Sequence, residues 1–124
     1  MLSLPPSVRI YVAKEPADMR KSFDGLSALV TDTVQRDPLS GHLFVFRNKR
    51  SDMVRILWWD RTGLALFSKR LERGCFHFLE RAVTADASFE LDASDLMLIL
   101  EGIDLSQTTR RFKNPMNLRA KQQI

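Results

Sequence analysis

Residues 42–73, HLFVFRNKRSDMVRILWWDRTGLALFSKRLER, decide the fold, because three apolar runs are separated here by two short polar links. The first run, 42–47, is apolar on both faces of an extended chain, which predicts an interior strand. The link 48–52 is polar and predicts a solvated hairpin loop before a second strand at 53–59. Asp60 to Gly63 has the residue order of a type I turn, so 64–71 completes a three-stranded meander.

A strand and a helix are predicted on the N-terminal side of this meander. Val8–Val12 alternates apolar and polar residues and is rich in β-branched side chains, which predicts a first strand. Asp18 can cap a helix over residues 18–35, in which apolar residues recur at three- and four-residue steps for about five turns. Pro38 follows, and the residue before a proline avoids the helical region. The sequence therefore predicts a long amphipathic helix after the first strand.

The C-terminal side adds shorter elements. Phe89–Leu91 predicts a short edge strand, and Asp92 can cap a second helix that Gly102 ends. These elements predict an α+β fold: a mainly antiparallel sheet of four or five strands, packed against one long helix near 18–35 and one shorter helix near 92–101. We expect a single compact domain over 1–107 and a basic C-terminal tail over 108–124, whose order the sequence leaves open.

Composition narrows the class of partner. The 124 residues carry 19 Lys and Arg against 15 Asp and Glu, a net charge of +4, which favours an acidic partner, with nucleic acid first and an anionic membrane surface second. One cysteine excludes a disulfide framework. The longest apolar runs are far shorter than the roughly 20 residues of a membrane span, and the opening residues do not resemble a signal peptide. We therefore expect a cytoplasmic protein without membrane contact.

Enzymatic chemistry finds little support. None of the five glycines lie close enough together to form a phosphate-binding loop, so neither a nucleotide nor another cofactor is expected. Cys75 and His77 share a face in an extended chain and can form a nucleophilic pair, but a small buried thiol is the plainer interpretation. A metal-dependent nuclease needs converging carboxylates, and only Asp24 lacks a ready structural explanation. We expect no metal site, and the nuclease stays a minor alternative.

Basic residues carry the stronger signal, because they recur at strand ends and turns of the predicted meander, where rigid supports can present them to phosphate. The aromatic residues Phe44, Phe46, Trp58 and Trp59 interleave with them, which suits base stacking but equally suits a core. A charged hairpin can also be only a soluble hairpin, and successive loops alternate between the two ends of a meander. The candidate DNA-binding residues are Arg47, Lys49, Arg50, Arg55, Arg61, Lys69, Arg70, Arg73, Arg110 and Arg111.

A second candidate site lies at the start of the predicted long helix. Arg20 and Lys21 fall in its first turn, where the helix dipole disfavours each cation by about 0.3 to 1 kcal/mol. Either Asp18 and Asp24 pair with them, or this end of the helix faces an anion or an acidic patch of a partner. We therefore regard Arg20 and Lys21 as a partner-binding or anion site.

Five segments, in order and with similar spacing, resemble the small TnpB accessory proteins of the insertion-sequence sixty-six family; they are residues 18–26, 40–47, 57–63, 69–74 and 100–104. These proteins are distinct from the much longer RNA-guided nucleases that share the name. The chain departs from the usual pattern at Ser22, often glycine in relatives, and at Cys75, where many relatives are basic. The aromatic-Arg-Pro ending of many members is here replaced by the sequence of residues 112–115.

The resemblance implies a protein that is encoded beside a separate DDE-type transposase and is needed for efficient transposition. No enzymatic activity is established for the family, so the resemblance implies no catalytic residue. We expect a non-catalytic accessory protein of DNA transposition that contacts double-stranded DNA at the element ends, the transposase of the same element, or both, through its basic hairpin loops. The alternatives are a pure protein-interaction module for the transposase and, as a minor one, a metal-dependent nuclease.

Overall fold

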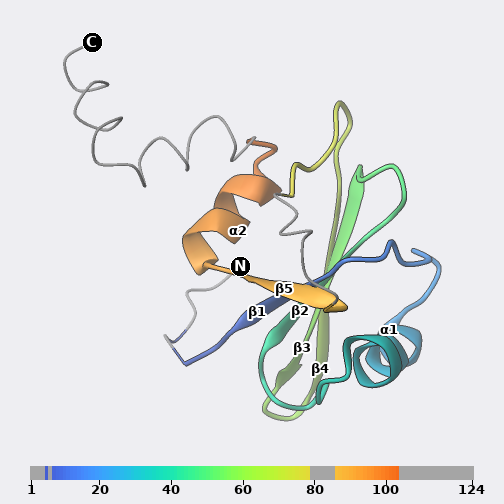
Figure 1. Ribbon diagram of the computed structural model, residues 1–124, viewed down its shortest axis with the longest axis vertical. Coiled ribbons are helices and arrows are strands. Elements are labelled where there is room, and N and C mark those ends of the chain that lie inside the picture. Colours follow the sequence, from blue (N-terminus) through green and yellow to red (C-terminus); the bar gives the residue numbers. More distant parts are fainter. Residues whose placement is uncertain (1–4, 6, 79–85, 104–124) are drawn as a thin grey trace.

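The computed structural model describes residues 5, 7–78 and 86–103, and in it a five-stranded sheet separates two helical segments (Figure 1). The elements follow one another along the chain as β1 (Ile10–Ala13), α1 (Phe23–Leu29), the π-helix η1 (Val30–Val34), β2 (Leu43–Arg47), β3 (Met53–Asp60), β4 (Gly63–Arg70), β5 (Ser88–Leu91) and α2 (Ala93–Leu100). Within these residues no helix is long and apolar enough to cross a bilayer. The predicted tail, 108–124, lies outside the described residues.

The strands lie in the order β4-β3-β2-β1-β5. β3 pairs antiparallel with β2 and β4, and β5 pairs antiparallel with β1. β1 and β2 are parallel, so the sheet is mixed. The prediction of a mainly antiparallel sheet is correct for three of its four strand pairs and missed this one. The parallel pair arises because the chain crosses over between β1 and β2 through the α1 segment, as parallel neighbours require.

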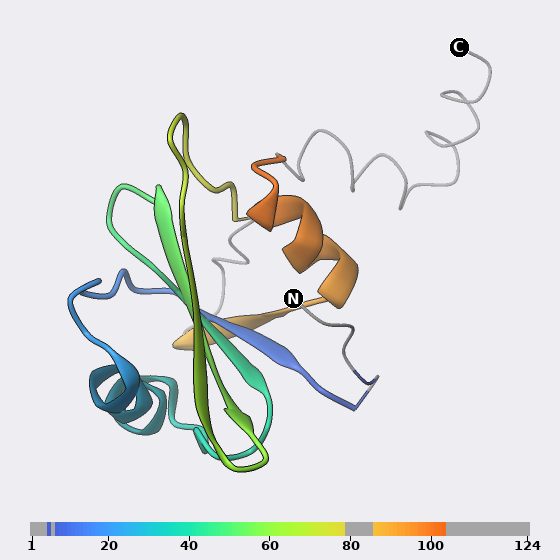
Figure 2. The ribbon, with the colours of Figure 1, turned by 180° about the vertical axis from the view of Figure 1, so that it is seen from behind.

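β2 is the central strand, and both of its faces are covered, as predicted. Leu43 and Val45 belong to a core shared with α2, whereas Phe44 and Phe46 belong to a core shared with α1 and η1. All four side chains are buried. Figure 2 shows the two helical segments on opposite sides of the sheet. Alternation along one strand thus supplies both cores, because successive side chains point to opposite faces.

The long helix predicted over 18–35 is shorter in the structure. α1 has 7 residues and η1 has 5, and helical structure begins at Phe23 rather than at Asp18. The Asp18 carboxylate accepts a hydrogen bond from the backbone N–H of Arg20 at 2.9 Å. The backbone carbonyl of Asp18 accepts one from the N–H of Lys21 at 3.0 Å. These bonds close a separate turn before the helix. Phe23, an apolar residue within the predicted amphipathic helix, is 43% exposed.

The C-terminal ends of the helical segments lie close to their predicted positions. η1 ends at Val34, one residue before the predicted end at residue 35, and Gln35 follows it in the left-handed conformation at a φ of 61°. α2 lies where a second helix was predicted, but Asp92 caps it without a side-chain hydrogen bond. Gly102 follows α2 at a φ of 84°, a conformation that glycine adopts readily. β5 confirms the predicted strand near Phe89–Leu91.

The β3–β4 hairpin is confirmed, but its turn type is not. Asp60 pairs with Gly63, which leaves Arg61 and Thr62 as a two-residue link. Arg61 has a φ of 56°, whereas both central residues of a type I turn have negative φ. Positive φ in a two-residue hairpin link matches the right-handed twist of the flanking strands, which a type I turn does not. Strand twist therefore overrides the local residue order.

Candidate nucleic-acid interface

Four exposed basic residues lie at one end of the β2–β3–β4 meander. Lys49 and Arg50 belong to the β2–β3 loop, and Arg70 and Arg73 lie at and after the end of β4. Both segments lie at the same end of the sheet, at the top of Figure 1. We call Lys49, Arg50, Arg70 and Arg73 the hairpin-end cluster. The structure thus brings together four of the ten candidate DNA-binding residues.

Backbone hydrogen bonds hold the two segments of the cluster together. The N–H of Leu71 donates to the carbonyl of Asp52 at 2.8 Å, and the N–H of Phe76 donates to the carbonyl of Ser51 at 2.6 Å. The Ser51 hydroxyl returns a bond to the Phe76 carbonyl at 3.1 Å. Phe76 is itself buried in the core shared with α2. The loop that carries Lys49 and the segment that carries Arg73 are therefore anchored to each other and to the core.

The β2–β3 loop has its own internal support. The Asn48 side chain donates to Asp52 Oδ1 at 2.6 Å and accepts the backbone N–H of Met53 at 3.1 Å. The N–H of Ser51 donates to the Asn48 carbonyl at 3.1 Å. Asn48 thus ties both sides of the loop around Lys49 and Arg50. These two cations stand on a hydrogen-bonded support, the arrangement that presents charge to a phosphate backbone.

Carboxylates accompany the cluster. The hydrogen bond from Asn48 is the main cause that lowers the pKa of Asp52 below its ordinary value. The positive charges of Arg50 and Arg70 lower it further. Asp52 is therefore ionised at neutral pH. Arg50 Nη2 lies 4.0 Å from Asp52 Oδ2, and the Arg50 side chain is 85% exposed, so this pair is weak. Glu72 adds a second, exposed carboxylate, and the cluster keeps an excess of positive charge.

Three other candidate cations make hydrogen bonds inside the protein. Arg47 Nη2 donates to the Lys14 carbonyl at 2.9 Å, and Arg55 Nη1 donates to the Lys21 carbonyl at 2.8 Å. Lys69 Nζ donates to the carbonyl of Leu100 at 2.7 Å, at the end of α2. Each bond joins the sheet to a segment more than 30 residues away. The hydrogen bonds of these three side chains therefore stabilise the fold.

The remaining candidates lie elsewhere. Arg61 sits in the β3–β4 turn, next to Asp60, which lies seven residue steps along β3 from the Met53–Arg70 pair, or about 24 Å. It is exposed but lies at the opposite end of the sheet from the hairpin-end cluster. The predicted basic residues therefore do not form one continuous surface, because successive hairpin links lie at opposite ends of the meander. Arg110 and Arg111 lie outside the described residues.

Arg20 and Lys21 precede α1 rather than occupying its first turn, so the expected conflict with the helix dipole does not arise. Arg20 Nη2 lies 2.8 Å from Asp18 Oδ2, which confirms one of the two expected outcomes for Arg20. Hydrogen bonds from the Arg20 side chain and backbone lower the pKa of Asp18 to about 2. Lys21 is exposed, and its backbone carbonyl is held by Arg55.

The aromatic residues do not form a stacking surface at the cluster. Phe44 and Phe46 are each 1% exposed and belong to the core. Trp58 and Trp59 are half-buried and lie at the Asp60 end of β3, away from the cluster, and Trp58 packs against the α2 core. The aromatic rings therefore lie apart from the hairpin-end cluster.

The residues considered from the sequence for nucleophilic or metal-dependent catalysis lie in different segments. Cys75 is half-buried in the segment after β4, and Asp24 is exposed in the first turn of α1. Within residues 7–78 and 86–103, no group of three or more histidine, cysteine, aspartate or glutamate side chains is arranged to hold a metal ion.

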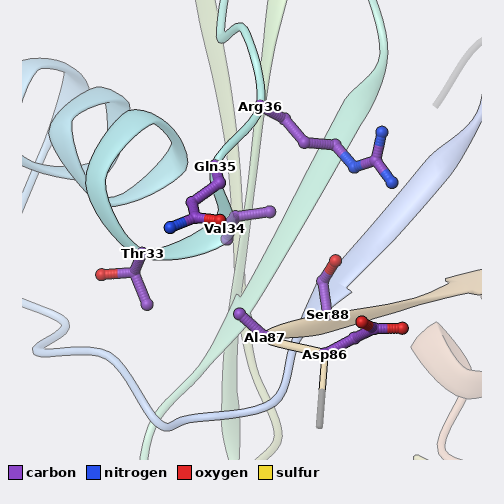
Figure 3. A pocket seen from close by; sticks show the side chains of 7 residues that line it. All are labelled: Thr33, Val34, Gln35, Arg36, Asp86, Ala87 and Ser88. Atoms are coloured by element: carbon purple, nitrogen blue, oxygen red, sulfur yellow. The ribbon is translucent and has the colours of Figure 1, made fainter. Parts of the chain in front are cut away.

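Sequence reasoning missed a polar pocket of about 520 Å³ between the end of η1 and the start of β5 (Figure 3). The Arg36 guanidinium lies 3.9 Å from the centroid of the Tyr11 ring, a cation–π contact that holds it beside β1. No motif marks this pocket, because it is made by segments far apart in the chain. Its lining residues are Thr33, Val34, Gln35, Arg36, Asp86, Ala87 and Ser88.

Comparison with known proteins places the chain in a family. Two proteins of Sinorhizobium fredii (strain NBRC 101917 / NGR234), both described as uncharacterized and designated y4jC and y4hO, are each 36% identical to it over 104 residues. The matches cover 84% of this chain and 86% and 88% of theirs. No solved structure matches significantly. The sequence profile of the IS66 Orf2-like proteins matches residues 8–110, and the chain therefore belongs to the IS66 Orf2-like family.

Proposed function

We propose that this protein is a non-catalytic accessory protein of DNA transposition that contacts duplex DNA at the ends of its element through the hairpin-end cluster. Membership of the IS66 Orf2-like family supports the role in transposition. The observation that supports DNA contact is the joining of four exposed cations, on two chain segments, by backbone hydrogen bonds. On such a support the backbone of both segments is already held in place when the side chains meet phosphates.

The cluster sets the expected strength and type of binding. If each of its four cations neutralises one phosphate, the slope of log K against log salt is about −3.6 for duplex DNA. Contacts to phosphate carry no sequence information, so similar affinities for element-end DNA and for unrelated duplex DNA are expected from this surface alone. Selection of the element ends then rests with the transposase.

One observation favours a second candidate function. Asp52 is ionised and lies near Arg50 and Arg70, and the exposed Glu72 stands between Arg70 and Arg73 in the chain, so a phosphate backbone meets repulsion as well as attraction. Mixed charge of this kind also suits docking on a protein surface, where opposite charges can be matched in pairs. The alternative is an interaction module that binds an acidic surface of the transposase and makes no DNA contact.

A binding titration with matched variants tests the proposal. Fluorescence anisotropy at low salt compares the wild-type protein with Lys49→Ala/Arg50→Ala and with Arg61→Ala, which removes an exposed hairpin cation at the other end of the sheet. The double variant is expected to weaken binding to both element-end and random duplexes, and Arg61→Ala to leave it unchanged. Absence of binding, or equal losses in both variants, would contradict DNA contact at the cluster.

Co-purification separates the two functions. The protein and the transposase of the same element are purified together before and after nuclease treatment. An association that survives the nuclease and is lost in Lys49→Ala/Arg50→Ala supports docking through the cluster. An association that the nuclease abolishes shows that DNA joins the two proteins.

A further inference from the structure

β4 forms one margin of the described sheet and runs for eight residues, Gly63–Arg70, without a proline. Leu64, Leu66 and Phe67 in this strand are only half-buried. In Figure 2, β4 runs in front of the other strands, with α1 and α2 to either side. A long edge strand with apolar side chains and unpaired backbone groups is a template for pairing with another strand.

The ladder with β3 shows which backbone groups point outward. The N–H of Leu71 donates toward β3, to Asp52, and in an antiparallel ladder the residues that bond to a given neighbour alternate. The residues of β4 that lie an even number of positions from Leu71 therefore make their backbone hydrogen bonds to β3. The N–H and C=O groups that point away from β3 belong to Leu64, Leu66, Ser68 and Arg70.

We propose that two copies of this chain pair antiparallel along β4, about a two-fold axis at Phe67, and so join their sheets into one. In this register Leu64 of one copy lies opposite Arg70 of the other, and Leu66 lies opposite Ser68. All four outward-facing residues of each copy then find a partner within the other β4. An axis at Leu66 instead places Arg70 of each copy opposite Thr62 of the other, outside the strand, and leaves both ends unpaired.

The side chains of β4 favour antiparallel pairing with β4 of a second copy of the chain. Antiparallel pairing places Lys69 and Arg70 of one copy beside Ala65 and Leu64 of the other, so the two Arg70 residues lie six residue steps apart, or about 20 Å. Phe67 meets Phe67 of the other copy across the axis, and such aromatic cross-strand pairs are favourable. Parallel pairing would instead align Lys69 with Lys69.

The pairing is also closed. An isologous two-fold contact uses β4 of both copies completely, so it stops at a dimer. It places the two hairpin-end clusters beyond opposite ends of the paired strands, because Arg70 of each copy lies at the far end from that of the other. The inference does not depend on DNA contact, since it rests on the edge of the sheet alone.

A proline substitution tests the pairing in the full-length protein. Ser68 is exposed, and its N–H points away from β3, so Ser68→Pro removes an outward donor without removing a bond of the β3–β4 ladder. Light scattering is expected to give twice the 14.3 kDa chain mass for the wild type and for Ser68→Ala, and a single chain mass for Ser68→Pro. A monomeric wild type, or a dimer unaffected by the proline, would overturn the proposal.

Spin labels test the register without relying on the proline variant. In a Cys75→Ser background, one sample carries a label at Ser68→Cys and another at Thr62→Cys. Around an axis at Phe67, the Cα atoms of the two residues at 68 are roughly 7–8 Å apart, and those at 62 are ten residue steps, or about 34 Å, apart. A short distance at 68 with a long one at 62 is expected. Equal distances at both sites would refute antiparallel pairing along β4.

Discussion

Arg55 and Lys21 join the sheet to the segment before α1, since Arg55 Nη1 donates to the Lys21 carbonyl at 2.8 Å. Arg55 Nε is buried without a hydrogen-bond partner among the described residues, so the side chain gives up solvation to make this contact. A residue that the sequence suggests as a DNA ligand is thus a support for the fold.

Arg55→Ala is expected to lower the free energy of unfolding by about 1–3 kcal/mol, because the Lys21 carbonyl loses a charged hydrogen-bond donor. Affinity of the folded variant for duplex DNA is expected to stay within twofold of the wild type. Urea unfolding and anisotropy measure the two quantities. A variant that keeps its stability but loses DNA affinity would show instead that Arg55 takes part in DNA binding.

Lys69→Met tests the contact between β4 and α2. The substitution keeps the apolar stem but removes the ammonium group that donates to the Leu100 carbonyl at 2.7 Å, at the end of the helix where a cation is favourable. Faster hydrogen exchange at the end of α2 is expected, together with a loss of about 1 kcal/mol of stability. Unchanged exchange of the Glu101 and Gly102 amides would show that the bond does not hold the helix end.

Gln35→Gly is expected to stabilise the protein by up to about 1 kcal/mol, because Gln35 ends η1 at a φ of 61°, where a side chain is strained and glycine is not. Gln35→Ala is the matched control, since alanine keeps the strain and is expected to leave the free energy of unfolding nearly unchanged. Thermal unfolding of both variants makes the comparison. Equal stability of the two variants would show that φ at this position costs little.

The pKa of Asp18, lowered from 3.8 to about 2, depends first on its hydrogen bonds with Arg20. A carboxyl whose pKa is depressed by folding stabilises the native state above its unfolded pKa, and that contribution is lost as the pH falls from about 4 toward 2. Arg20→Gln is therefore expected to return the pKa of Asp18 toward 3.8 and to flatten the stability curve in that range. Carboxyl NMR titration measures the pKa directly, and an unchanged value would assign the shift to another cause.

The core could be predicted from the sequence, whereas the sheet order could not. Alternation of Phe44 and Phe46 with Leu43 and Val45 correctly indicates a strand covered on both faces, because burial leaves a period of two in the residue types. The same pattern carries no information on strand direction, so the parallel pairing of β1 with β2 was missed. The start of α1 was missed because Asp18 can cap a helix or close a turn with Arg20, and the sequence allows both.

The candidate site was predictable only in part. The loop that carries Lys49 and Arg50 follows from its position between two apolar runs, and both residues are exposed there. The engagement of Lys69 with Leu100 could not be inferred, since its acceptor is a backbone carbonyl 31 residues away. The location of Arg61 at the opposite end from Arg70 follows from strand direction once the hairpin is drawn.

The most direct test of the central claim is the salt dependence of DNA binding. Duplex affinity is measured across a series of salt concentrations for the wild type and for Lys49→Ala/Arg50→Ala. The wild-type log-log slope is expected near −3.6 and the double variant near −1.8, because two phosphate contacts are lost. A wild type that does not bind duplex DNA at low salt, or a slope that the double substitution leaves unchanged, would contradict DNA contact through the hairpin-end cluster.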